Sequence, residues 1–241
     1  MATSRAPVQL ASTVWPCSLI PLGDRALTVD LATADGAPPR ALVRALAARL
    51  NADTVPGVVA VVPAIQSVTL HYDPRRTTFG ALHGTLDHIL ASLEVTADAD
   101  VEPVVIPVCY GGEFGPDLQD VANAHQTTPD AIVAAHTDAL YTVAMIGFLP
   151  GFPYLDGLAP SLHTPRRATP RTAVPAGSVG IGGSSTGVYP FTSPGGWHTI
   201  GRTPRVLFSA TRDRPSLLQA GDRVRFTAIS ASSLRALMET P

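Results

Sequence analysis

The distribution of proline and glycine constrains the fold of this chain more than any other feature of its sequence. The 241 residues include 20 glycines and 23 prolines, and nearly half of these lie between Gly147 and Pro204. Helices and central strands tolerate few such residues, so this segment is expected to form short strands joined by long loops. A hydrophobic fraction of 45% still argues for a buried core. We therefore expect the functional site within an ordered, loop-rich segment.

The charge composition excludes several kinds of chemistry. All 17 basic side chains are arginines, because the sequence contains no lysine. The chain therefore cannot form a lysine Schiff base, carry biotin on a lysine or hold a phosphate with a Walker A lysine. The net charge of −2 predicts no nucleic-acid partner. The longest apolar run, from Ala139 to Pro150, is too short to cross a bilayer, so no membrane partner is predicted either.

The cysteine content indicates a reducing compartment. Cys17 and Cys109 are too few for a disulfide framework, and they lie far apart in the sequence. The first residues, interrupted by Pro16 and Pro21, form a poor signal peptide. We predict a cytoplasmic protein with two reduced thiols.

The first region, residues 1–95, is predicted to be a small domain of strands and helices. Strands are predicted at residues 25–31, 58–62 and 67–72. Helices are predicted after Pro38-Pro39 and over residues 82–93, because leucines recur there with the period of an amphipathic helix. Two helices on one face of a small sheet form an α+β domain, and the pattern favours a ferredoxin-like fold.

A linker is predicted at residues 96–103. The stretch VTADADVE, at 95–102, is acidic and lacks large apolar side chains. The second domain, residues 104–241, is predicted to begin with a strand at 104–110 and two short helices at 117–125 and 129–136. Further strands are predicted at residues 143–148, 178–182, 205–209 and 223–229. Short strands separated by proline and glycine are typical of a closed antiparallel barrel, so this domain is predicted to be mainly β.

Four runs in the second domain resemble a known family. They are GFLPGFPYLDG at 147–157, PRRATPR at 165–171, VPAGSVGIGG at 174–183 and SPGGWHTIGRTP at 193–204. Their order and spacing resemble those of the 5-oxoprolinase B subunit family, also called allophanate hydrolase subunit 1 or the kinase-inhibitor family. PLGD at 21–24 and AGDRVRF at 220–226 extend the resemblance toward both ends. The chain reads GGSSTG at 182–187 where many members read AGGQTG, and this departure leaves the exact substrate open.

The resemblance implies a cyclophilin-like barrel preceded by a small α/β domain. It also implies a cytoplasmic complex with two other proteins, a barrel protein like the 5-oxoprolinase C subunit (allophanate hydrolase subunit 2) and an A subunit of the LamB/YcsF type. Such complexes are similar to ATP-dependent 5-oxoprolinases, which open the lactam of 5-oxoproline to give glutamate. The chain is then expected to be an amidohydrolase subunit that is inactive alone, with ATP used by the complex and not held by a Walker loop here.

Three other functions remain open at this point. The family resemblance also allows an allophanate or urea amidohydrolase subunit, or a regulator that binds and inhibits a sensor histidine kinase. A peptidyl-prolyl isomerase is suggested by the barrel alone, which is a weak warrant because one fold supports many activities.

The candidate site residues come from the same runs. His198 is predicted as a general base, and Arg202 or Arg171 as a bidentate clamp for a substrate carboxylate. Glycines at 180–183 and 195–196 permit positive φ, so their N–H groups could form a nest for an oxyanion, or they could simply turn barrel corners. The catalytic residues are thus predicted to be His198 and Arg202, and the substrate-binding residues to be Phe148, Tyr154, Arg171, Gly182, Gly183, Ser193, Gly195, Gly196 and Trp197.

Several of these residues also have plain structural interpretations. The aromatic side chains of the 147–157 run could pack a constrained loop instead of lining a pocket, and Trp197 could anchor the barrel or an interface. Arg166 and Arg167 could be solvated, or a partner subunit could contact them. A lone histidine such as His198 is often a packing or surface residue.

Two other motifs fail on inspection. Residues 183–187 fit the G-x-S-x-G pattern of serine hydrolases, but Val188-Tyr189-Pro190 follows where that motif requires a helix. His83 and His88 are five residues apart on a predicted helix and would point about 140° from each other. No chelating cluster accompanies them, so no metal site is predicted on this chain.

Overall fold

The computed structural model describes residues 8–10, 17–31, 40–94 and 102–239. The contacts divide the chain into two compact units, Met1–Ala99 and Asp100–Pro241, and each is described by itself. The domain limits predicted from the sequence stay a prediction, because residues 95–101, which hold most of the predicted linker, lie outside the described residues.

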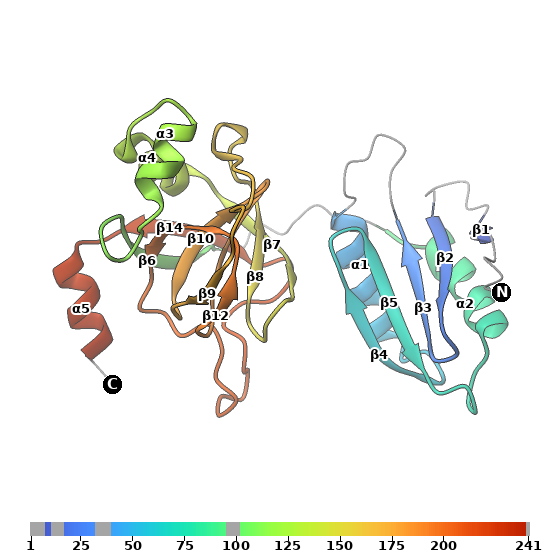
Figure 1. The fold of residues 1–241 in the computed structure, drawn as a ribbon. Coiled ribbons are helices and arrows are strands. Elements are labelled where there is room, and N and C mark those ends of the chain that lie inside the picture. Colours follow the sequence, from blue (N-terminus) through green and yellow to red (C-terminus); the bar gives the residue numbers. More distant parts are fainter. Residues whose placement is uncertain (1–7, 11–16, 32–39, 95–101, 240–241) are drawn as a thin grey trace. The chain divides into compact units, whose positions relative to one another are not determined.

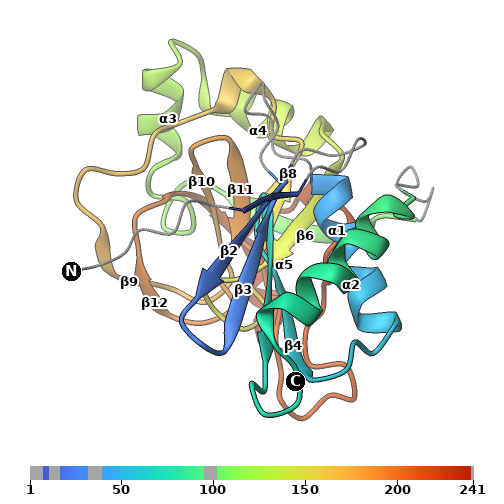
Figure 2. The same ribbon diagram turned by 90° about the vertical axis from the view of Figure 1, so that its right-hand side faces the viewer.

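The first unit is a five-stranded antiparallel sheet with two helices. Its elements are β1 (Val8–Leu10), β2 (Cys17–Leu22), β3 (Ala26–Asp30), α1 (Arg40–Ala52), β4 (Val58–Pro63), β5 (Ser67–Tyr72) and α2 (Phe79–Ala91). The strands lie in the order β1-β2-β3-β5-β4. Figure 2 shows α1 and α2 together on one side of this sheet. Leu46 of α1, Leu86 of α2 and Leu70 of β5 are buried in one shared core, as the apolar periodicity predicted.

The ferredoxin-like connectivity is not confirmed. A ferredoxin-like domain runs β-α-β-β-α-β, whereas the part from β2 to α2 runs β-β-α-β-β-α (Figure 1). The difference arises at β2, a strand that the sequence pattern did not predict because Pro21 lies within it and the turn at Gly23 follows directly. In the structure, Leu19 of β2 pairs with Val29 of β3 and is fully buried, so this strand contributes to the core.

The second unit is a closed seven-stranded barrel with helices and a two-stranded sheet. Its elements are β6 (Val104–Tyr110), α3 (Leu118–Ala124), α4 (Pro129–Asp138), β7 (Tyr141–Ile146), β8 (Pro153–Asp156), the 3-10 helix η1 (Pro160–Leu162), β9 (Arg171–Val174), β10 (Ser178–Gly182), β11 (Ser185–Val188), β12 (Ser193–Gly195), β13 (His198–Arg202), β14 (Arg223–Ala228) and α5 (Ala231–Glu239). The barrel order is β10-β11-β8-β7-β14-β6-β13, and β9 pairs with β12.

The mainly-β barrel was predicted, but two details differ from the sequence-based expectation. The barrel is not wholly antiparallel, because β14 pairs with β6 in parallel. The strand predicted at residues 205–209 does not form; of these residues, Phe208 makes an isolated bridge to Ser216. The backbone there bonds to a loop instead of a barrel strand, because the N–H of Leu217 donates to the carbonyl of Leu207 and the N–H of Ser209 to that of Pro215. Leu207 is buried, while the neighbouring Val206 is 54% exposed.

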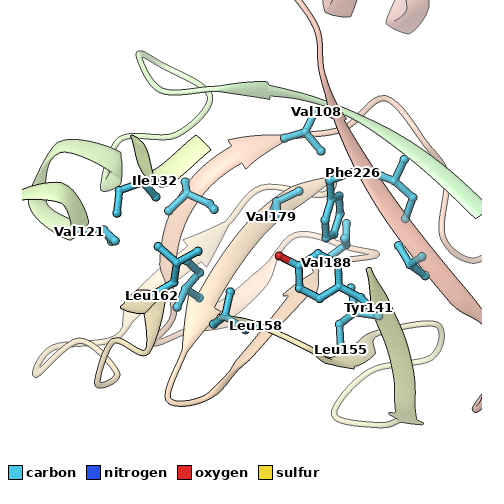
Figure 3. Packing of buried hydrophobic residues seen from close by; sticks show 14 of the residues in the cluster. Val108, Val121, Ile132, Tyr141, Leu155, Leu158, Leu162, Val179, Val188 and Phe226 are labelled. Atoms are coloured by element: carbon cyan, nitrogen blue, oxygen red, sulfur yellow. The ribbon is translucent and has the colours of Figure 1, made fainter. Parts of the chain in front are cut away.

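The barrel core is built from inward-facing strand residues and from the helices beside them. Val179 of β10, Val188 of β11 and Phe226 of β14 are buried there, and Figure 3 shows Val121 of α3 and Ile132 of α4 in the same cluster. Strand alternation explains the first three, because every second side chain of a barrel strand points inward.

His136 on α4 is the polar centre of this core. The Thr186 hydroxyl donates to the Gly180 carbonyl at 3.0 Å, so it must accept from Nε2–H of His136, also at 3.0 Å. Nδ1 of His136 then accepts from the Tyr110 hydroxyl at 2.8 Å. Burial lowers the pKa of His136 to about 3, so the ring is neutral and α4 is fixed to the barrel by two hydrogen bonds.

Candidate functional site

Glycine makes the outer face of β10 and β11 unusually flat. Along these strands Val179, Ile181 and Val188 point into the barrel core, whereas Gly180, Gly182 and Gly187 point outward. A Cβ atom at Gly182 would lie 2.5 Å from the indole of Trp197, and one at Gly187 would lie 3.1 Å from it. Only glycine therefore lets the indole lie directly on the barrel backbone.

An aromatic cluster covers this glycine face. The rings of Phe152 and Trp197 are 5.4 Å apart and nearly perpendicular, and Tyr189 and Tyr154 contact Phe152 at 5.1 Å. Phe152, Tyr189 and Trp197 form a buried core separate from that of the barrel. Such edge-to-face contacts add stability beyond that of area burial alone. The part of the barrel wall formed by β10 and β11 is thus covered by the barrel core on its inner face and by the aromatic cluster on its outer face.

Phe148 extends the aromatic cluster to the surface through a strained turn. Its φ is +66°, and the N–H of Leu149 donates to the carbonyl of Gly147 at 2.7 Å, which is the geometry of a positive-φ γ-turn. This turn is rare and costs backbone strain, which often accompanies functional sites. The Phe148 ring is 59% exposed although it contacts Phe152 and Tyr189 edge-on.

A buried carboxylate lies at the start of α3, beside the aromatic cluster's loops. Asp117 is 2% exposed at its side chain and accepts hydrogen bonds from both terminal nitrogens of Arg171 and from one of Arg167, at 2.6 to 2.7 Å. It also accepts from the N–H of Thr199 at 2.7 Å. Burial alone would raise the pKa of Asp117, but these bonds and both arginine charges hold it below the usual value.

Asp117 was not singled out as a site residue in the sequence. There it is an acidic residue in the first turn of a predicted helix, where a negative charge suits the helix dipole. Its arginine partners are 50 and 54 residues away. No local pattern in the sequence signals such a contact.

The two ring nitrogens of His198 differ in their hydrogen bonding. Its Nε2 lies 3.0 Å from the carbonyl oxygen of Pro165, which can only accept, so Nε2 carries the proton. In the neutral form of the ring, Nδ1 then holds the lone pair. That atom is buried and has no hydrogen-bond partner among the described residues. A histidine oriented in this way is chemically suited to accept a proton.

The structure does not bring the two predicted catalytic residues together. His198 begins β13 and Arg202 ends it, so about 13 Å of strand separates their backbones. Nε of Arg202 donates to the carbonyl of Ala176 at 2.9 Å. The role predicted for Arg202 stays a prediction, and the arrangement around His198 does not include it.

The remaining predicted residues lie around the aromatic cluster. Gly195 packs under the hydroxyl of Tyr189, and the carbonyl of Gly196 accepts from the N–H of Arg167 at 2.8 Å. Ser193 is buried, and its hydroxyl donates to the carbonyl of Pro194 at 3.3 Å. The structure thus collects Phe148, Tyr154, Arg171, Gly182, Ser193, Gly195, Gly196 and Trp197 around one outer face of the barrel.

The backbone at the predicted nest glycines differs from the expectation. Of residues 180, 182, 183, 195 and 196, only Gly183 has positive φ, at +66°. Gly183 is exposed and exchanges two backbone hydrogen bonds with Thr164. Gly180, Gly182 and Gly195 instead lie against Trp197 or Tyr189, so the close approach of aromatic side chains, not a left-handed backbone, explains glycine at these three positions.

Two further kinds of feature are absent within the described ranges. No group of three or more histidine, cysteine, aspartate or glutamate side chains is placed to hold a metal ion there. No helix among these residues is long and apolar enough to cross a membrane.

Comparison with known proteins places the chain in a family. Residues 17–218 match the family model described as carboxyltransferase domain, subdomain C and D. The B subunit of 5-oxoprolinase from Haemophilus influenzae is 46% identical over 209 residues, which are 87% of this chain and 96% of that protein. The B subunit of 5-oxoprolinase from Bacillus subtilis is 39% identical over 228 residues, 90% of this chain and 95% of that protein.

Solved structures share the fold of this chain. The crystal structure of TTHA0988 has a TM-score of 0.74 and 37% identity over 86% of this chain, and this chain spans 40% of that longer chain. Urea amidolyase from K. lactis has a TM-score of 0.76, but its 19% identity shows a shared fold alone; the match covers 97% of this chain and 16% of that one. The family predicted from the four sequence runs is confirmed: the chain belongs to the 5-oxoprolinase B subunit family of carboxyltransferase-type domains.

Proposed function

We propose that this chain belongs to an ATP-dependent 5-oxoprolinase, a complex that hydrolyses the lactam of 5-oxoproline to glutamate. The observation that carries the proposal is the similarity to two proteins named as the B subunit of 5-oxoprolinase, along almost their whole length. Neither relative's name points to a kinase regulator, which favours the enzyme over that alternative. We place the complex in the cytoplasm, where the two buried free cysteines, Cys17 and Cys109, would stay reduced.

The chain works together with other subunits. Its proposed partners are a barrel protein like the 5-oxoprolinase C subunit and an A subunit of the LamB/YcsF type, and the chain is inactive without them. The comparison with TTHA0988 supports a neighbouring segment, because more than half of that longer chain lies beyond the part that resembles this one. Without any lysine, this chain offers no Walker A loop, so ATP is bound through other means or by a partner.

The outer aromatic face and its arginine loop form the proposed active region. Opening a lactam by water requires a base that accepts a proton and positive groups that stabilise developing negative charge. Nδ1 of His198 is the proposed proton acceptor, because Pro165 fixes the proton on Nε2. The arginines of the 165–171 loop supply positive charge, and Phe148, Tyr154 and Trp197 are the proposed walls of the substrate site.

Reconstitution with the partner subunits tests this proposal. We expect glutamate release that requires ATP, 5-oxoproline and all subunits, with no release by this chain alone and no hydrolysis of allophanate or urea. Changing His198 to Ala should lower kcat by about 10²–10⁴-fold, the usual contribution of a positioned acid or base. His163→Ala is the matched control, because Nε2 of His163 also binds a backbone carbonyl, that of Leu158 at 3.1 Å.

Three outcomes contradict the proposal or one of its parts. Hydrolysis of allophanate or urea but not of 5-oxoproline would assign the other amidohydrolase activity. Full activity of the His198→Ala complex would remove the proton-acceptor role. Full activity after Arg202→Ala would likewise end the role predicted for that arginine.

A further inference from the structure

Three arginines of the 165–171 loop differ sharply in their surroundings. Arg167 and Arg171 are partly buried and bound to Asp117 through their terminal nitrogens. Arg166, between Pro165 and Arg167, is exposed and makes no hydrogen bond or ion pair within the described part of the chain. Of these three arginines, Arg166 therefore keeps all the N–H groups of its guanidinium available to a ligand.

The backbone on both sides of Arg166 is held in place. The carbonyl of Pro165 accepts from Nε2 of His198 at 3.0 Å, and the N–H of Arg167 donates to the carbonyl of Gly196 at 2.8 Å. The ion pair from Arg167 to Asp117 at 2.7 Å adds a third attachment. An exposed arginine on such an anchored backbone loses less conformational freedom on binding a ligand than one on a free loop.

Two tyrosines of the aromatic cluster lie within electrostatic reach of Arg166. Burial raises the pKa of Tyr154 and of Tyr189, and the charge of Arg166 opposes both shifts. The exposed ring of Phe148 contacts Tyr189 edge-on, with centroids 6.4 Å apart. The backbone geometry agrees, because the N–H of Arg167 binds the carbonyl of Gly196 and the neighbouring Gly195 packs under the Tyr189 hydroxyl. Arg166 therefore belongs to the same part of the outer face as Tyr189 and the exposed ring of Phe148.

We propose that Arg166 binds the oxyanion of a small ligand on this face, with the ligand's body packed against Phe148. A planar guanidinium pairs in bidentate fashion with carboxylate or phosphate, and the aromatic side chains suit an apolar ring. This inference rests on the proposed function, in which the oxyanion is the carboxylate of 5-oxoproline or a phosphate derived from ATP. Asp117 is then a positioning residue, because it holds the two neighbouring arginines and thereby fixes the loop.

Titration calorimetry on the full chain and on the reconstituted complex tests the site. The probes are 5-oxoproline, inorganic phosphate and pyrrolidone, which is the lactam ring without the carboxylate. We expect Arg166→Ala to weaken binding of one oxyanion by about tenfold or more, as loss of a charged hydrogen bond does. Arg166→Lys keeps the charge and should restore part of that affinity. Pyrrolidone binding should be unaffected.

Arg225→Ala is the matched control, because Arg225 is also exposed and lies on β14, three strands away from both β10 and β11 around the barrel. It should bind every probe as the unchanged chain does. A loss confined to 5-oxoproline identifies the carboxylate as the ligand group, and a loss confined to phosphate identifies the phosphoryl group.

The inference is overturned if Arg166→Ala binds both oxyanions as tightly as the unchanged protein, or if neither oxyanion binds to chain or complex. Failure of the proposed 5-oxoprolinase activity would give a different experimental result from failure of the oxyanion site. A complex that releases no glutamate but binds phosphate through Arg166 would contradict the 5-oxoprolinase activity and leave the oxyanion site standing.

Discussion

Asp117 holds Arg171 by a two-pronged ion pair, with Nη1 to Oδ2 at 2.6 Å and Nη2 to Oδ1 at 2.7 Å. The bidentate pairing that the sequence suggested between Arg171 and a substrate carboxylate is made here with a carboxylate of the chain itself. Because Asp117 also binds Arg167 and the N–H of Thr199, this single side chain connects α3, the arginine loop and β13.

We expect Asp117→Asn to lower the free energy of unfolding of the barrel unit by about 2–4 kcal/mol. The amide keeps the size of the side chain but removes the charge that compensates two partly buried arginines. Urea unfolding followed by Trp197 fluorescence, in a Trp15→Phe background that leaves Trp197 as the only tryptophan, measures this loss. Asp120→Asn, at an exposed site in the same helix, should change stability by less than about 0.5 kcal/mol. Equal effects of both changes would contradict a special role of Asp117.

We expect Gly182→Ala to destabilise the barrel unit by about 1–3 kcal/mol and to shift the emission of Trp197. The new Cβ would lie 2.5 Å from the indole, so the ring must move. Gly196→Ala is the control, because its Cβ would meet only Pro170, at an ordinary 3.7 Å, and its φ is not positive. A normal emission spectrum in Gly182→Ala would show that the indole does not depend on this close approach.

The barrel unit is expected to lose stability as the pH falls from about 6.5. Burial lowers the pKa of His136 to about 3, so in this range the unfolded chain binds a proton that the folded chain does not. The loss should reach about 2 kcal/mol by pH 5, given an ordinary histidine pKa near 6.5. His136→Gln should flatten the slope between pH 4 and 6.5. Asp117, with its lowered pKa, contributes a similar loss only below its ordinary value near 3.8. An unchanged slope in His136→Gln would assign the pH dependence to another group.

Gly84→Ala should stabilise the first unit by about 0.5–1 kcal/mol. Gly84 is exposed within α2, and a Cβ there would meet no atom within 4 Å, so alanine gains helix propensity without a clash. Hydrogen exchange of the α2 amides measures the gain. Gly57→Ala should instead destabilise the same unit, because φ is +81° and the Cβ would lie 2.7 Å from Thr77. Slower exchange in both variants would contradict this reasoning.

The elements that could be predicted from the sequence are those in which local periodicity coincides with burial. Leu42, Leu46 and Leu50 recur at helical spacing and are all buried in one core, and α1 follows from that pattern. Strand β10 was also predicted with its observed limits. Strand β2 was missed because its second half is exposed and contains Pro21, which weakens the alternation of a half-buried strand.

The candidate site was only partly predictable for a different reason. The glycine and aromatic residues stand out in the sequence, so their region was found, but their spatial pairing was not. Gly182 makes room for Trp197, and Arg167 binds Asp117, through contacts between residues far apart in the chain. The residue types in a sequence indicate which side chains could take part in a site. Which of these side chains contact one another depends on the folded structure.

The parallel pairing of β14 with β6 has a consequence for synthesis on the ribosome. β6 is the first strand of the barrel unit and β14 is the last, and β14 fills the position between β6 and β7. Until Arg223–Ala228 has emerged, β6 and β7 each keep an open edge that can pair with another chain. The barrel therefore closes late, and a nascent chain halted before β14 should be more prone to aggregation than the completed unit.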